Sequence, residues 1–154
     1  MMKLSSPSRN IEFIGDHNND SIVLGNYGDA KITAKGNFNL SGIIFCKKNT
    51  VEISLDGDGT VSFTGFCKKL LIQAIDGDCT LDLSNLACDT VRLESGKGKS
   101  VTILGRTKMI EQVNLENEAV VKYQGRPLLV SYTLSGNAKI ENITAKQESM
   151  KMAG

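Results

Sequence analysis

Short strand-like segments recur about every 20 residues along this chain, a period typical of repeat architectures. Their first apolar residues are Ile32, Val61, Leu81, Val101, Val121 and Ile140, and from Val61 onward the spacing is nearly constant. The next residue is always polar and the one after it is usually apolar, which is the alternation of a half-buried strand. Such a period favours a repeat fold, because one unit can bury its apolar side only against the next unit.

Each period contains two further strand-like segments. One set begins near Val51, Leu71, Val91 and Val113, and a shorter set ends at the cysteines Cys46, Cys67 and Cys88. Three short strands per period, separated by turns, predict an all-β, single-stranded parallel β-helix of about six coils. The preference of parallel crossovers for one hand predicts a right-handed solenoid. The register of residues 70–75 stays open at this point.

Other strand-rich or repeat folds fit less well. A β-sandwich does not require equivalent residues to recur at this regular spacing. A leucine-rich repeat has a similar period, but only residues 81–86 resemble its pattern. A helical repeat would need an apolar pattern with the period of the α-helix, which the units lack.

The repeat predicts one β-helix domain over residues 10–143. Residues 1–9 are expected to form a flexible N-terminus, and residues 144–154 a tail or a short capping helix. The step from Ile32 to Val61 is nearly half a period longer than the later steps, which predicts an insertion at residues 36–42. Exposed strand edges at the ends of a β-helix would allow a homo-oligomer through end or face association.

One corner of the repeat is acidic. Stacked coils would place Asp56 over Asp76 and Asp58 over Asp78. Four close carboxylates repel one another unless a cation compensates, and Lys97 in the next coil is a candidate partner. One interpretation is a Ca²⁺ site, since this ion prefers oxygen ligands. The other is that Asp and Gly are simply turn-forming residues, and this interpretation is favoured.

Each of the remaining polar motifs has an ordinary structural interpretation. His17, the single histidine, is expected in a polar connecting loop over residues 16–20. Lys47 and Lys48 would stack beside Lys68 and Lys69 as a solvated corner or a small anion-binding patch. The four cysteines, Cys46, Cys67, Cys79 and Cys88, contain no CxxC pair and are expected to be free, buried thiols.

Composition excludes several classes of protein. The 18 basic and 17 acidic residues give a net charge of +1, whereas a general nucleic-acid binder shows a basic excess. No apolar run is long enough for membrane insertion as a helix. The first residues contain no apolar leader, and free cysteines suit a reducing compartment. A cytoplasmic location is expected for the chain as given, and an exported or cell-surface location if a leader is removed.

Several stretches resemble a known bacterial family. They read LDGDGTV (55–61), IDGDCTL (75–81), DLSNL (82–86), VRLESGKG (91–98), YQGRP (123–127) and YTLSGNAKI (132–140). Their order resembles the head GIN domain of auto-transporter adhesins, a parallel β-helix domain of unknown function. The resemblance covers about residues 50–143, implies a surface or scaffold role, and transfers no catalytic residue.

The sequence therefore predicts a non-enzymatic structural or binding module of the adhesin type, with a glycan or protein surface as ligand. Binding would use the outward ladder Thr33, Ser62, Asp82, Thr102, Lys122 and Glu141. No cofactor is expected apart from Ca²⁺ at the acidic corner. The alternative is a carbohydrate-active enzyme, a polysaccharide lyase or hydrolase, that uses Asp56, Asp58, Asp76 and Asp78.

Overall fold

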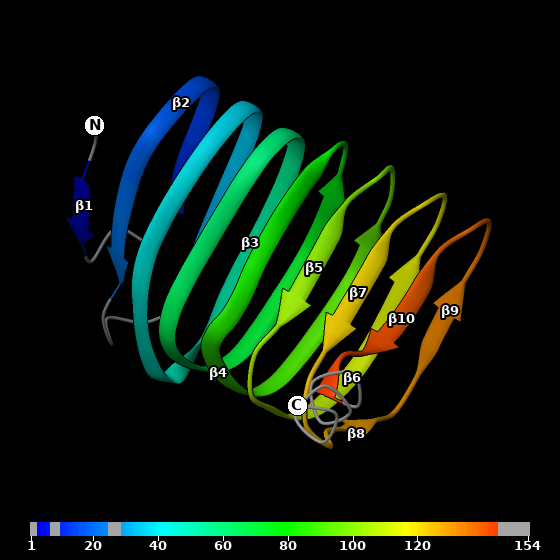
Figure 1. Cartoon of the computed structure of the whole chain (residues 1–154). Coiled ribbons are helices and arrows are strands. Elements are labelled where there is room, and N and C mark those ends of the chain that lie inside the picture. Colours follow the sequence, from blue (N-terminus) through cyan, green and yellow to red (C-terminus); the bar gives the residue numbers. More distant parts are fainter. Residues whose placement is uncertain (1–2, 7–9, 25–28, 145–154) are drawn as a thin grey trace, which may run out of the picture.

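The chain forms a right-handed parallel β-solenoid (Figure 1). The computed structural model describes residues 3–6, 10–24 and 29–144. About six turns of roughly 20 residues lie side by side, and the strand pairs between the described elements are parallel. The fold class predicted from the period is therefore confirmed.

The described residues form one sheet of ten strands that winds around the solenoid. Strand β3 alone passes through more than two turns without a break. The strands are β1 (Lys3–Ser6), β2 (Asn10–Leu24), β3 (Ala30–Asp76), β4 (Cys79–Gly96), β5 (Val101–Leu104), β6 (Thr107–Leu115), β7 (Val120–Tyr123), β8 (Leu128–Leu129), β9 (Tyr132–Leu134) and β10 (Lys139–Asn142).

Inward-facing residues of successive turns lie directly over one another. Val61 pairs with Leu81, and Val121 pairs with Ile140 two turns further on. Paired strands lie about 4.8 Å apart, so these files of apolar side chains fill the interior continuously. Most members are fully buried, and they belong to a single hydrophobic core along the solenoid.

One member of this file was predicted wrongly. Val101 pairs with Thr80 and is half-buried, whereas Thr102 pairs with Leu81 and is only 1% exposed. The turn from Leu81 to Thr102 is thus one residue longer than the period predicts. Because a shift of one residue exchanges the two faces of a strand, the threonine points inward although the valine is the more apolar residue.

The insertion predicted at residues 36–42 is also wrong. Strand β3 is continuous there, and Gly36 pairs with Gly15 as an ordinary member of the stack. Ile32 pairs with Ile11 and does not belong to the file of Val61. Lys31, the residue before Ile32, forms an ion pair with Glu52 of the next turn at 3.3 Å. The step from one turn to the next therefore has its ordinary length here.

Residues 16–20 lie within β2 and do not form the connecting loop that was expected. They pair with the segment from Asn37 to Leu40, with a register shift between Asn18 and Asp20. Pairing with the next turn therefore extends the strand through a polar sequence. The side chain of His17 lies outside the described residues.

The register of residues 70–75 is settled by burial and pairing. Leu70, Ile72 and Ile75 are each no more than 1% exposed. Leu70 pairs with Val91, and Ile72 with Leu93. This segment thus supplies inward residues to the second set of files, but Leu71, which the spacing aligned with Val91, pairs with Arg92 instead.

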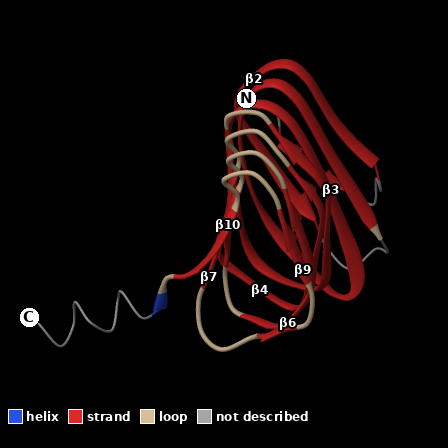
Figure 2. Ribbon diagram, turned by 90° about the vertical axis from the view of Figure 1, so that its right-hand side faces the viewer, coloured by secondary structure: helices blue, strands red, loops and turns tan. Residues whose placement is uncertain are grey.

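A file of turn residues with positive φ lies along one corner. It contains Gly57, Gly77, Gly98, Asn117 and Gly136, and Asn117 (φ 61°) is the single non-glycine residue with positive φ in the described residues. Asparagine tolerates the left-handed region better than other side chains do. Figure 2 shows turns of this corner stacked over one another. Each turn of the solenoid therefore makes the same bend at the same place.

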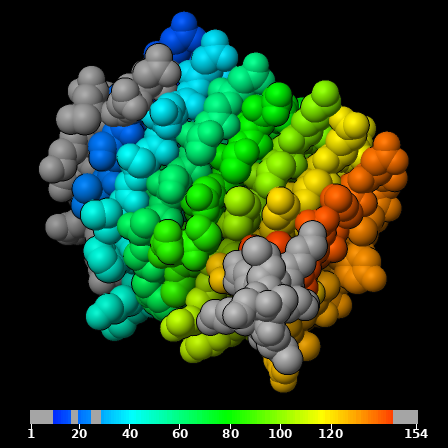
Figure 3. All heavy atoms as spheres, in the orientation of Figure 1, coloured from blue at the N-terminus to red at the C-terminus, as the bar shows by residue number. Residues whose placement is uncertain are grey.

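The N-terminal end of the stack differs from the predicted boundary. β1 pairs with residues 21–24, so the stack begins before residue 10. Each turn crosses the surface as an oblique band (Figure 3). The last turn, residues 124–144, carries β8, β9 and β10. Apart from Thr144, the predicted tail or capping helix lies outside the described residues.

Candidate functional site

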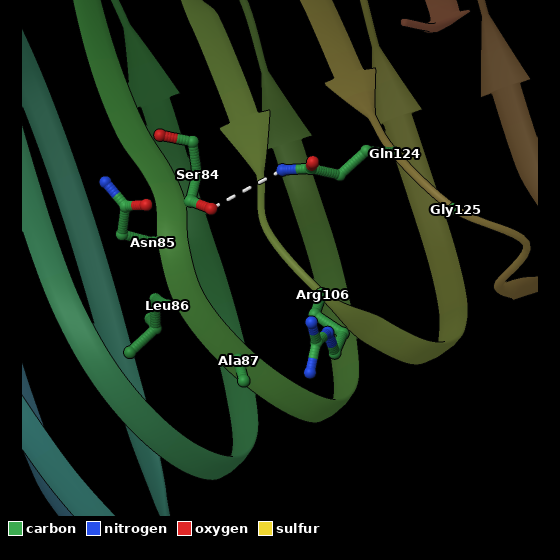
Figure 4. Close-up of a pocket in the computed structure, with 7 residues that line it drawn as sticks. All are labelled: Ser84, Asn85, Leu86, Ala87, Arg106, Gln124 and Gly125. Carbon is green, nitrogen blue, oxygen red and sulfur yellow. Dashed lines mark hydrogen bonds between the residues drawn. The ribbon is translucent and has the colours of Figure 1, made fainter. Parts of the chain in front are cut away.

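A groove of about 330 Å³ opens at the corner opposite the positive-φ turns. Its lining comes from three successive turns: Ser84, Asn85, Leu86, Ala87, Arg106, Gln124 and Gly125 (Figure 4). The volume lies at the lower end of the range for small-molecule sites. Asn85 and Arg106 are exposed, so an amide and a guanidinium are available at its surface.

The groove arises from a change in corner length. Leu83 pairs with Leu104, and Cys88 pairs with Thr107. Residues 84–87 thus bridge the corner in one turn, but only Gly105 and Arg106 bridge it in the next. The shorter corner is recessed relative to the longer one, and the recess is the groove.

Two residues shape this recess. Gly105 is buried, and a Cβ atom there would collide with the backbone oxygens of Leu83, Ser84 and Leu86. Only glycine allows this close approach of the two turns. The Gln124 amide donates hydrogen bonds to the carbonyl oxygens of Ser84 (3.4 Å) and Leu104 (3.3 Å), so it ties three turns together.

An outward file leads into the groove. Phe66 pairs with Ala87. In the next turn, Thr107 pairs with Cys88, so Arg106, the residue before Thr107, lies beside Ala87. Gly65 lies against the backbone of Ile44, and the same register places Phe45 beside Phe66. Phe45 is 51% exposed, and Phe66 is half-buried.

A second outward file at this corner is basic. It contains Lys47, Lys68, Asp89 and Lys108, and Lys48 and Lys69 adjoin it. We call Lys47, Lys48, Lys68, Lys69 and Arg106 the basic corner. Asp89 is the single carboxylate of the second file, and it is paired with Lys108 at 3.3 Å. The predicted stacking of the two lysine pairs agrees with the register of this region, in which Cys67 pairs with Cys88 and Lys69 with Thr90.

The acidic corner lies at the other end of the same strands. Asp56, Asp58, Asp76 and Asp78 are all exposed, and the approach of Gly77 to the backbone of Gly57 stacks the two turns as predicted. The Asp76 carboxylate accepts a hydrogen bond from its neighbouring Gly77 N–H at 2.8 Å. Among the described residues, no group of three or more His, Cys, Asp or Glu side chains is arranged to hold a metal ion.

Lys97 was considered as a partner for these carboxylates. Its ammonium instead lies 3.9 Å from Glu116 in the following turn. Both groups are largely exposed, so this pair contributes little to the free energy of folding.

The cysteines are buried and form no disulfide, as predicted. The Sγ atoms of Cys67 and Cys88 lie 3.4 Å apart on adjacent turns. The hydrogen bond with Cys88 and burial raise the pKa of the Cys67 thiol far above its ordinary value. Burial, followed by the charges of the four aspartates, raises the pKa of Cys79 to about 12. Both thiols are therefore poor nucleophiles at neutral pH.

The predicted outward ladder is only partly correct. Ser62 pairs with Asp82, and Lys122 pairs with Glu141 on the same face. Ile103 takes the outward position predicted for Thr102, because this turn has one residue more than expected. Asp82 accepts hydrogen bonds from the Ser84 amide (3.0 Å) and hydroxyl (2.6 Å).

Thr33 does not belong to this ladder, since it pairs with Glu12. Glu141, at the other end of the ladder, is ion-paired with Lys139 at 2.9 Å. The ladder from Ser62 to Glu141 thus contains the apolar side chain of Ile103 and two carboxylates, Asp82 and Glu141, that already have polar partners. The groove and the basic corner offer more accessible polar groups.

The groove residues Asn85, Arg106 and Gln124 were missed from the sequence. The signal that could have found them is a change in spacing at the corner. The step from Leu83 to its partner Leu104 is longer than the step from Cys88 to its partner Thr107. The second step therefore leaves a shorter corner in the later turn.

The chain matches no protein-family model, curated protein or solved structure. Within the described part of the chain, no helix is long and apolar enough to span a bilayer.

Proposed function

We propose that this protein is a non-enzymatic binding module of the adhesin type, which holds an extended ligand such as a glycan at the groove corner. The observation that carries the proposal is the groove of about 330 Å³, where the exposed Asn85 and Arg106 side chains lie beside an outward file of regularly spaced residues. A repeating surface of this kind suits a repeating polymer, because equivalent groups recur about every 4.8 Å.

Two further features support the proposal. The groove is shaped by the close backbone approach at Gly105 and by the hydrogen bonds of the Gln124 side-chain amide, so it is already formed before a ligand binds. The resemblance of residues 50–143 to the head GIN domain of adhesins also agrees with a role in surface binding. A homo-oligomer through the last turn, which exposes apolar side chains, is compatible with such a role.

The proposal is tested by binding to a panel of immobilised oligosaccharides. The double variant Asn85→Ala/Arg106→Ala should lose at least tenfold in affinity for whichever glycan the wild type binds. The control variant Lys99→Ala removes an exposed cation near the acidic corner and should bind as the wild type does. Equal affinity of the double variant and the wild type would show that the groove is not the site.

The alternative of a carbohydrate-active enzyme predicts turnover that depends on the acidic corner. The four carboxylates there are exposed, and none of them lines the groove. A depolymerisation assay on the same glycans, with Asp56, Asp58, Asp76 and Asp78 all changed to Asn, separates the two functions. Turnover by the wild type that the fourfold variant lacks would refute the binding-module proposal.

A further inference from the structure

We propose that the basic corner, with Phe45 and Phe66, binds a linear polysaccharide that carries carboxylate groups. This inference rests on the proposed function and adds the chemical class of the ligand. It assigns the ligand's acidic groups to the lysines and its apolar ring faces to the phenylalanines.

Like charges are stacked at this corner. The register that aligns Ile44 with Gly65 places Lys48 beside Lys69, whose partner on the other side is the uncharged Thr90. Like charges directly opposite each other on neighbouring strands destabilise a sheet. An anionic ligand that lies across both turns would remove this repulsion, so binding and stability are coupled there.

The same corner carries an exposed aromatic surface. The Phe45 side chain is 51% exposed and its neighbour Ile43 is 42% exposed, next to lysines of the same strand. An exposed phenylalanine offers a flat apolar face on which the apolar side of a sugar ring can pack. An apolar file and a basic file thus lie side by side along one surface, where the ring faces and the acidic groups of one sugar polymer can each find a partner.

The aromatic surface is continuous with the groove. The outward file runs from Phe45 over Phe66 and the small Ala87 to Arg106. Three steps of about 4.8 Å make this track roughly 14 Å long. The Arg106 guanidinium at its end can hold a carboxylate with two parallel hydrogen bonds. The track therefore favours an oligomer over a single sugar.

The charge of the whole protein favours a polysaccharide over a nucleic acid. The net charge is +1, so with the five cations of the basic corner set aside, the remainder of the chain carries −4. Nucleic-acid binding draws most of its affinity from many phosphate contacts and normally requires a basic domain. A small basic corner on a protein that is otherwise acidic suits a polymer of lower charge density.

The probe is a set of galacturonic acid oligomers of defined length, measured by calorimetry at low salt. The same oligomers with methyl-esterified carboxylates are the matched neutral ligand. We expect binding that strengthens with oligomer length, weakens with added salt, and falls at least tenfold on methyl esterification. Equal binding of the ester would overturn the inference.

Three protein variants test the location. Lys48→Glu/Lys68→Glu should weaken binding at least tenfold, while Lys35→Glu/Lys99→Glu changes the net charge equally at exposed lysines elsewhere and should weaken it less than threefold. Phe45→Ala should weaken binding without changing its salt dependence. Equal losses in both double variants would mean that only net charge matters, and would refute the assignment.

A folding readout accompanies these measurements. Lys69→Gln should raise the melting temperature of the free protein, because it removes a stacked like charge, and should reduce the stabilisation that the oligomer gives the wild type. Tighter binding of single-stranded DNA than of the oligomers would also overturn the inference. Groove-dependent binding of neutral glycans alone would leave the proposed function standing, whereas absence of any glycan binding would remove both.

Discussion

The central turns and the last turn are built from the same kind of strand, yet they differ in burial. Val61, Phe63 and Leu81 in the central turns are fully buried. In the last turn, Leu128 is 60% exposed and Tyr132 is 58% exposed. Both regions pair in parallel through the same ladder. Burial in a solenoid therefore depends on having a neighbour on both sides, not on the composition of the turn.

The largest expected effect is loss of a central core side chain. Phe63→Ala should lower the free energy of unfolding by about 3–5 kcal/mol, because it leaves a cavity in the core. Leu128→Ala in the last turn should cost less than about 0.5 kcal/mol, since the side chain is mostly exposed. Urea unfolding monitored by circular dichroism measures both, and similar losses would mean that the last turn is covered in solution.

Glycine substitutions give a second matched pair. Gly59→Ala should cost more than about 2 kcal/mol, because φ is +139° and a Cβ would collide with the Phe38 backbone. Gly125 in the last turn also has a positive φ, +78°, but nothing lies within 4 Å of the position that an added Cβ would take. Gly125→Ala should cost about 1–2 kcal/mol, the strain of the backbone alone. Thermal melting of the two variants under one condition makes the comparison, and a larger loss for Gly125→Ala would contradict it.

The inward threonine offers a stabilising change. Thr102→Val replaces a buried hydroxyl in the file between Leu81 and Val121 by a methyl group. It should raise the free energy of unfolding by about 1 kcal/mol, because a hydroxyl is costly in an apolar environment. Thr133→Val, on the exposed strand β9, should have almost no effect. Destabilisation by Thr102→Val would indicate that the hydroxyl is well hydrogen-bonded in the core.

A further expected effect concerns alkaline pH. Burial and nearby aspartates raise the pKa of Cys79 from about 9 to about 12. The unfolded state therefore loses its thiol proton first, and this contribution to stability is present below pH 9 and lost as the pH rises through 12. The melting temperature of Cys79→Ala should fall less than that of the wild type between pH 8 and pH 11. Parallel decreases would refute the role of this thiol.

The sequence was sufficient for the period and the parallel stack, because alternation within a strand is a local property. It failed where one turn gains or loses a residue. Val101 is the more apolar choice, but pairing with Thr80 fixes its orientation, and only the neighbouring turn contains that information. The groove was missed for the same reason. It depends on the different corner lengths at residues 84–87 and at Gly105–Arg106, which no single strand reveals.

The file of turns from Gly57 to Gly136 has an implication for the history of this chain. Since every turn bends at the same place and packs only against its two neighbours, a gene segment that encodes one turn encodes one complete unit of the stack. Duplication or loss of such a segment would lengthen or shorten the rod by one unit and leave both junctions intact. Proteins of this kind can therefore change size in steps without passing through an unfoldable intermediate.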